Sequence, residues 1–100
     1  MYLPDADAVL WSDVRRNRLL RYDAATGAVS VERQPADFCN GHTLDHDGRV
    51  IACEHGTRSV VRTERDGSTT VIADRYDGKR LNSPNDVVVA ADGAVWFTDP

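Results

Sequence analysis

The sequence has 100 residues, of which 41% are apolar and 28% are charged. These proportions are typical of a folded globular chain and exclude disordered and collagen-like classes. Because 16 acidic residues outnumber 12 basic ones, the net charge is −4, and no basic stripe is available to bind nucleic acid. The apolar runs are also much shorter than a membrane span, so we expect no membrane partner. No secretory signal follows Met1, which leaves the cytoplasm as the expected location.

Short apolar segments of strand length follow one another along the whole chain. They are rich in β-branched and aromatic residues, which favour strands. No window has the i, i+3, i+4, i+7 spacing of an amphipathic helix. In chain order the predicted strand segments are 9–14, 18–22, 29–31, 49–53, 59–63, 70–72 and 87–89. The pattern therefore predicts an all-β chain.

Turn dipeptides separate these segments at intervals of about ten residues. Most of them are Asp-Gly, which predicts a tight two-residue hairpin turn because glycine supplies the positive φ that such a turn needs. The dipeptides are Thr26-Gly27, Asp47-Gly48, Asp66-Gly67, Asp77-Gly78 and Asp92-Gly93. Neighbouring strands are thus expected to be antiparallel.

The sequence repeats itself at a spacing of 41 to 45 residues. Segment 40–48 recurs 45 residues later at 85–93, with an Asn at the start and Asp-Gly at the end of each copy. Segment 18–21 is similar to segment 59–62 at a spacing of 41. A repeat of this length with four strands is typical of a β-propeller blade.

The repeat divides the chain into about two and a half predicted blades. Residues 1–35 form a first blade that lacks most of its inner strand, residues 36–80 a complete second blade, and residues 81–100 the first two strands of a third. A propeller needs at least about four blades to close. We therefore expect the exposed edges and faces to be covered by the remaining blades of a propeller or by another chain.

The chain resembles the gluconolactonase branch of the SMP-30/gluconolactonase/regucalcin-like family. The most specific part of the resemblance is Asn-Ser-Pro-Asn-Asp at 82–86 followed by Trp-Phe-Thr-Asp-Pro at 96–100. Leu-Trp-Ser-Asp-Val at 10–14, Cys-Glu-His-Gly at 53–56 and Lys-Arg-Leu at 79–81 fit the same branch. The resemblance extends over essentially the whole chain.

This resemblance implies six-bladed propellers with a divalent cation in the central channel, usually Ca²⁺, with Zn²⁺ or Mg²⁺ as alternatives. Many members hydrolyse sugar lactones. The chain is then expected to be a portion of a metal-dependent lactonase that opens a lactone ester, with a small sugar lactone as its partner. The alternative is a non-catalytic propeller that serves as a binding module, because propellers host many functions.

The resemblance also assigns one metal ligand, Asn85, at the start of the inner strand of blade three. An amide oxygen is a hard neutral donor suited to calcium, although an Asn after Pro84 can instead bond its own backbone in a turn. The family's remaining ligands and its general base come from positions outside these residues. We therefore expect no turnover from the chain alone, and assign it no catalytic residue.

Antiparallel pairing adds candidate substrate-binding residues at the same end of the channel. The end of a second strand returns beside the start of the first, which brings Glu54 and His55 near Asn40, and Asp99 near Asn85. Such a polar, acidic end suits a cation and a polyol. The alternative is a solvated rim of strand ends, in which Asp99 fixes an Arg or caps a turn.

A zinc site is the remaining alternative for this region. Cys39, His42, His46, Cys53 and His55 lie within 17 residues. Their spacing does not match the paired ligands of structural zinc sites. Buried, reduced cysteines are the preferred interpretation.

Overall fold

The computed structural model describes all residues from 1 to 100, and nearly all of its regular structure is β-strand. The one exception is a short 3-10 turn, η1 (Val14–Arg16). The strands are β1 (Tyr2–Leu3), β2 (Ala8–Asp13), β3 (Arg18–Asp23), β4 (Ala28–Arg33), β5 (Cys39–Leu44), β6 (Val50–Glu54), β7 (Ser59–Thr63), β8 (Thr69–Ala73), β9 (Arg75–Tyr76), β10 (Lys79–Arg80), β11 (Asp86–Val89) and β12 (Val95–Thr98). The all-β prediction is confirmed, and no helix is long and apolar enough to cross a membrane.

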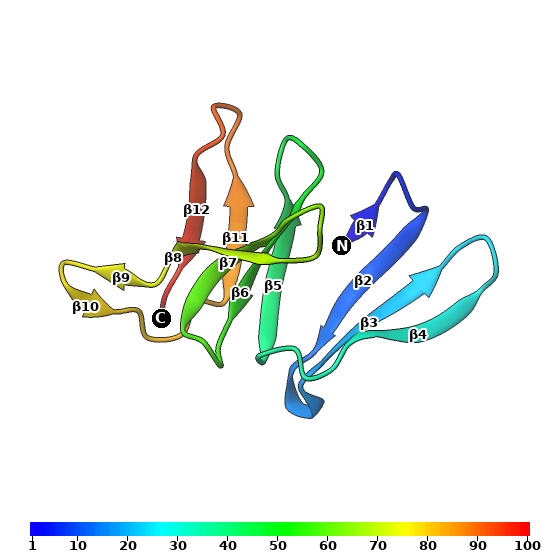
Figure 1. Cartoon of the computed structure of the whole chain (residues 1–100), viewed down its shortest axis with the longest axis horizontal. Helices are drawn as coiled ribbons and strands as arrows, with labels where there is room; N and C mark the ends of the chain where they lie inside the picture. Colours follow the sequence, from blue (N-terminus) through cyan, green and yellow to red (C-terminus); the bar gives the residue numbers. More distant parts are fainter.

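The strands are arranged as propeller blades, as the repeat predicts. Two four-stranded antiparallel sheets, β1–β4 and β5–β8, are followed by the two-stranded sheet β11–β12. We call these sheets blades one, two and three. Figure 1 shows blade two between the other two, and its inner strand β5 contacts both β2 and β11. The spacing is that of the sequence repeat, because β6 and β12 begin 45 residues apart and β3 and β7 begin 41 residues apart.

The hairpin loops differ from the prediction at most of the Asp-Gly positions. In blade two, Asp45 N–H donates to Arg49 O at 2.8 Å and Gly48 N–H to Asp45 O at 3.1 Å, which encloses three loop residues instead of two. Only glycine has a positive φ in this loop, which matches a turn followed by one left-handed residue. The same arrangement occurs at Gly67 and Gly93. A two-residue turn with positive φ at both positions is found at 77–78, between β9 and β10.

Blade two has an apolar core on each of its faces. Toward blade one, Ala52 and Cys39 pack with Ala36, Val61 and Leu19. The second cluster lies between blades two and three. It consists of Ile51, Cys53, Val60 and Ile72 from blade two and Val87, Val89, Val95 and Phe97 from blade three. The two cysteines are both free and buried, and they belong to these two different clusters. Strand β6 is therefore buried along almost its whole length, because both of its faces are covered.

The pKa of Cys53 predicts a loss of stability at high pH. Burial raises the pKa of this thiol from 9.0 to about 12. The unfolded chain releases the proton first, so the stabilisation is complete below pH 9 and is lost as the pH rises toward 12. The urea concentration at which half of the protein is unfolded should fall between about pH 8 and about pH 10.5. This fall should be smaller for Cys53→Ala than for the wild type. Equal differences in both proteins would assign the alkaline loss to other groups.

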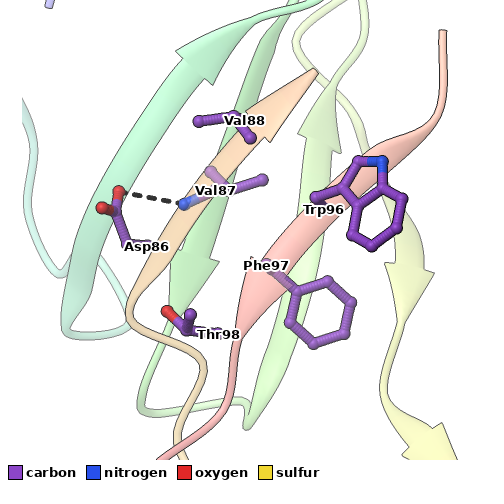
Figure 2. A pocket seen from close by; sticks show the side chains of 6 residues that line it. All are labelled: Asp86, Val87, Val88, Trp96, Phe97 and Thr98. Carbon is purple, nitrogen blue, oxygen red and sulfur yellow. Dashed lines mark hydrogen bonds between the residues drawn. The ribbon is translucent and has the colours of Figure 1, made fainter. Parts of the chain in front are cut away.

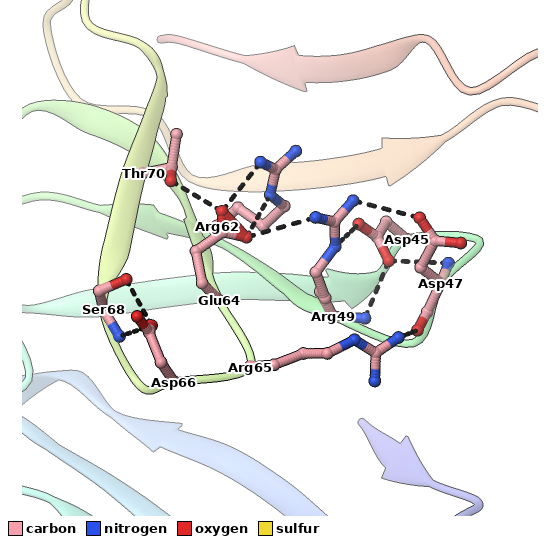
Figure 3. A network of polar contacts seen from close by, with 9 residues as sticks. All are labelled: Asp45, Asp47, Arg49, Arg62, Glu64, Arg65, Asp66, Ser68 and Thr70. Atoms are coloured by element: carbon pink, nitrogen blue, oxygen red, sulfur yellow. Dashed lines mark hydrogen bonds and ion pairs between the residues drawn. The ribbon is translucent and has the colours of Figure 1, made fainter.

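The end of blade two away from Asn40 is held by a network of ion pairs (Figure 3). Arg49 contacts Asp45 at 2.9 Å and Glu64 at 3.4 Å, and so joins the β5–β6 loop to the β7–β8 loop. Glu64 also accepts hydrogen bonds from Arg62 at 2.8 and 3.0 Å, and these bonds lower the pKa of its carboxyl to about 2. The charges at this end are thus paired with one another, and the network fixes the ends of the strands.

Candidate functional site

The inner strands of blades two and three meet where each strand begins. Gly41 N–H in β5 donates to the carbonyl oxygen of Asn85, just before β11, at 2.9 Å. Blade one joins them, because Ser12 Oγ donates to the carbonyl oxygen of Asn40 at 2.7 Å. The starts of β5 and β11 and the end of β2 therefore form one polar region, which we call the channel end.

Asn85 is half-buried and is held at three of its polar atoms. Its N–H donates to Thr98 O at 3.1 Å, and its carbonyl oxygen accepts the bond from Gly41. Its side-chain Oδ1 accepts a bond from Thr98 Oγ1 at 2.5 Å. A carbonyl oxygen has two lone pairs, so Oδ1 keeps one for a further partner. One oxygen of this kind fits a hard divalent cation as a single ligand.

Other ligand types do not gather around Asn85. No group of three or more His, Cys, Asp or Glu side chains in the chain is arranged to hold a metal ion. These residues therefore supply no complete set of metal ligands, and Asn85 offers a single neutral oxygen.

Asn40 and His55 lie together at the channel end, in the positions that antiparallel pairing predicts. Asn40 Nδ2 and His55 Nε2 are 3.2 Å apart. A carboxamide nitrogen only donates, so Nε2 of this histidine accepts and its proton resides on Nδ1. The pair can offer a further N–H donor to a bound molecule. Whether it contacts a substrate stays a prediction.

Glu54 directly precedes His55 in the sequence, but its side chain is turned into the protein. Its side chain is 2% exposed and accepts bonds from Arg33 Nη1 at 3.1 Å and Thr57 Oγ1 at 2.8 Å. Arg33 ends β4 of blade one, so the ion pair joins two blades. These contacts are those of a structural carboxylate. The predicted contact with substrate stays untested.

Asp99 follows β12 and contacts the loop that leads to Asn85. Its carboxylate accepts N–H bonds from Asn82 at 2.9 Å and Ser83 at 2.5 Å. The turn-capping alternative therefore describes the contacts that Asp99 makes here. Through this cap, the residue helps to place Asn85 at the start of β11, while a direct contact with substrate stays a prediction.

The residues of the zinc alternative lie in separate parts of the fold. Cys39 and Cys53 belong to different cores, and His55 bonds Asn40. His46 lies in the far loop of blade two, where Nε2 is 2.9 Å from Ala90 O. His42 has a buried Nε2 without a hydrogen-bond partner, and burial lowers the pKa of its imidazole.

Sequence reasoning missed two residues that organise the channel end. Thr98 lies inside the Trp-Phe-Thr-Asp-Pro motif, but its bond to Asn85 depends on the strand register. Gly41 belongs to the repeated segment 40–48, and the repeat alone does not indicate its contact. The signal that could have marked it is a glycine within a strand, because such a glycine often allows a close approach of another backbone.

A hollow of about 230 Å³ lies beside the channel end, over the β11–β12 ribbon (Figure 2). One face of the ribbon packs into the core of blade two through Val87. On its other face Val88 pairs with Trp96, and these side chains are 59% and 67% exposed. The hollow is lined by Asp86, Val87, Val88, Trp96, Phe97 and Thr98. Its lining is mainly apolar, which suits the packing of further protein rather than the binding of a polyol.

Comparisons with known proteins agree with this architecture. A family described as "SMP-30/Gluconolactonase/LRE-like region" matches residues 1–100. A gluconolactonase from Zymomonas mobilis is 39% identical over 114 residues, which covers 100% of this chain and 32% of the relative. The solved structure of a gluconolactonase from Xanthomonas campestris is 42% identical with a TM-score of 0.91, over 99% of this chain and 33% of that one.

A more distant structure, virginiamycin B lyase from Staphylococcus aureus, is 20% identical with a TM-score of 0.68, over 94% of this chain and 31% of that one. At this identity the likeness shows a shared fold alone. The chain spans about a third of the length of the relatives it matches.

Proposed function

Because the chain belongs to the SMP-30/gluconolactonase/LRE-like family, we propose that a complete propeller containing these blades hydrolyses the ester bond of a sugar lactone with a divalent cation. The observation that carries the proposal is the channel end. There Asn85 is held by both blades two and three and keeps a lone pair of Oδ1 available. The similarity to the gluconolactonases of Z. mobilis and X. campestris supports the choice of a lactone.

Asn85 would hold the cation through Oδ1, together with ligands from other blades. When bound, a divalent cation polarises an ester carbonyl and offsets the negative charge that develops on its oxygen. We propose Ca²⁺ as the first choice because a neutral amide oxygen suits a hard cation, with Mg²⁺ and Zn²⁺ as the alternatives to compare.

Asn40 and His55 would bind the hydroxyl groups of the sugar ring. The bond to Asn40 leaves the Nδ1–H of His55 as a donor of fixed position. A polyol presents several oxygen acceptors, so an oriented donor of this kind gives both affinity and orientation. Glu54 is a weaker candidate for this role, because both of its oxygens already have partners inside the protein.

The proposal predicts hydrolysis of gluconolactone that depends on metal and on Asn85. Activity of a complete propeller containing these residues should disappear with a chelator and return with one of the three cations. Asn85→Ala should weaken cation affinity about tenfold or more, since a ligand is lost. Calorimetric titration and a pH-stat assay would measure the two effects.

Asn82→Ala is the matched control, because it removes a carboxamide from the same loop. Its Nδ2 donates to Pro100 O at 2.7 Å, away from Asn85, so activity and affinity should stay near the wild-type values. Activity that survives complete removal of metal, or an Asn85→Ala variant equal to the wild type, would contradict the mechanism. Tight lactone binding without turnover would instead assign the propeller to the class of binding modules.

A further inference from the structure

Thr98 makes two contacts with Asn85, one through its backbone and one through its side chain. The carbonyl oxygen of Thr98 accepts the N–H of Asn85 at 3.1 Å, and its hydroxyl donates to Oδ1 at 2.5 Å. We propose that Thr98 is a positioning residue that fixes the carboxamide of Asn85 with its oxygen available to a cation. This inference rests on the proposed function, because it concerns the same ligand.

The distance of 2.5 Å from the Thr98 hydroxyl to the Asn85 side chain is typical of a contact with an oxygen and too short for one with a nitrogen. Hydrogen bonds between two oxygens span about 2.5–3.0 Å, whereas those between nitrogen and oxygen begin at about 2.7 Å. An asparagine side chain otherwise rotates about its last bond between two broad positions that exchange oxygen and nitrogen. Only the oxygen can bind a cation, since the amide nitrogen has no free lone pair. The Thr98 bond therefore favours the rotamer that serves as ligand.

The place of the Thr98 hydroxyl is itself set by the sheet. Thr98 lies opposite Asp86 in the β11–β12 register, which puts it one position from Asn85. Threonine is β-branched and has few side-chain rotamers in a strand, so its hydroxyl keeps one direction. Serine would retain the donor but would sample more directions.

The hydroxyl of Thr98 is suited to positioning because it adds little to the fold. The residue is exposed at the end of β12, and water can replace its hydrogen bond in the folded chain. The apolar core of this ribbon is formed by other residues, such as Val87 and Phe97. A change of ligand affinity can thus be separated from a change of stability.

The test is calorimetric titration of Ca²⁺ into a complete propeller that contains these residues. Thr98→Val removes the hydroxyl at constant shape and should weaken affinity about ten- to a hundredfold, the usual effect of losing a partner that orients a ligand. Thr98→Ser should remain within about threefold of the wild type, since it keeps the donor. Thr69→Val is the matched control, because Thr69 is an exposed threonine at the start of β8 and its hydroxyl has no hydrogen bond in the chain.

Melting curves without metal are the second readout and should agree within about 2 °C for all variants. If Thr98→Val does not fold, Thr98→Ala takes its place, because it removes the same hydroxyl without adding a second methyl group. A normal Ca²⁺ affinity of the valine or alanine variant, alongside a weakened Asn85→Ala, overturns the positioning role and leaves the proposed function intact. A normal affinity of Asn85→Ala overturns both.

Discussion

Replacing Gly41 by alanine is expected to separate blades two and three at the channel end. A Cβ built on Gly41 would lie 2.5 Å from Asn85 O and 2.9 Å from Asp86 Cα. Both are backbone atoms, which cannot rotate away as a side chain could. The strand starts would have to move apart, with the loss of the Gly41–Asn85 hydrogen bond. Overpacking and the lost bond together should cost about 3 kcal/mol of the free energy of unfolding.

Gly67→Ala provides the opposite control. Nothing lies within 4 Å of a Cβ at Gly67, but its φ of +88° is unfavourable for alanine. Its expected cost is only about 1 kcal/mol, from backbone strain. Urea unfolding would compare the two, and calcium titration of the complete propeller would test whether Gly41→Ala also disturbs Asn85. Equal stability of Gly41→Ala and the wild type would refute the tight contact between the blades.

The fold could be predicted from the sequence because the sequence repeats. Each unit carries the same alternation of strand and turn, so the weak signal of any one strand is reinforced by its copy 41 to 45 residues away. The loop geometry was less accessible, since Asp-Gly is compatible with both two- and three-residue hairpin loops. The network of hydrogen bonds within each loop, as at Asp45, makes that choice.

The candidate site was predicted as far as strand pairing allows. The neighbourhood of His55 and Asn40 could be predicted, because in an antiparallel pair it depends only on which strand ends meet. The direction of Glu54 could not be predicted in the same way. The pairing of β5 with β6 changes register between Cys39 and His42. Gly41 marks this place in the sequence, but a glycine does not specify in which direction the neighbouring side chains turn. The partner of Glu54, Arg33, comes from another blade, and contacts between blades depend on packing rather than on local pattern.

Replacing Arg33 by methionine is expected to destabilise the protein more than any other loss of an ion pair. Glu54 is 2% exposed, so the substitution would leave its carboxylate in the interior without its ionic partner. Removal of one member of a buried pair costs about 3–5 kcal/mol. The side chain of Arg33 is 40% exposed, and solvent screening should bring the cost to the lower part of this range.

Two further variants decide whether the buried charge is the cause. Arg21→Met removes an arginine from the 2.8 Å pair with Asp23, whose side chain is 33% exposed, and should be much milder because solvent screens this pair. Adding Glu54→Leu to Arg33→Met should recover part of the loss, because it removes the unpaired carboxylate. If urea unfolding instead shows Arg33→Met to be as mild as Arg21→Met, Glu54 does not need its ion pair. Its carboxylate would then be available for the contact with sugar that its position beside His55 predicts.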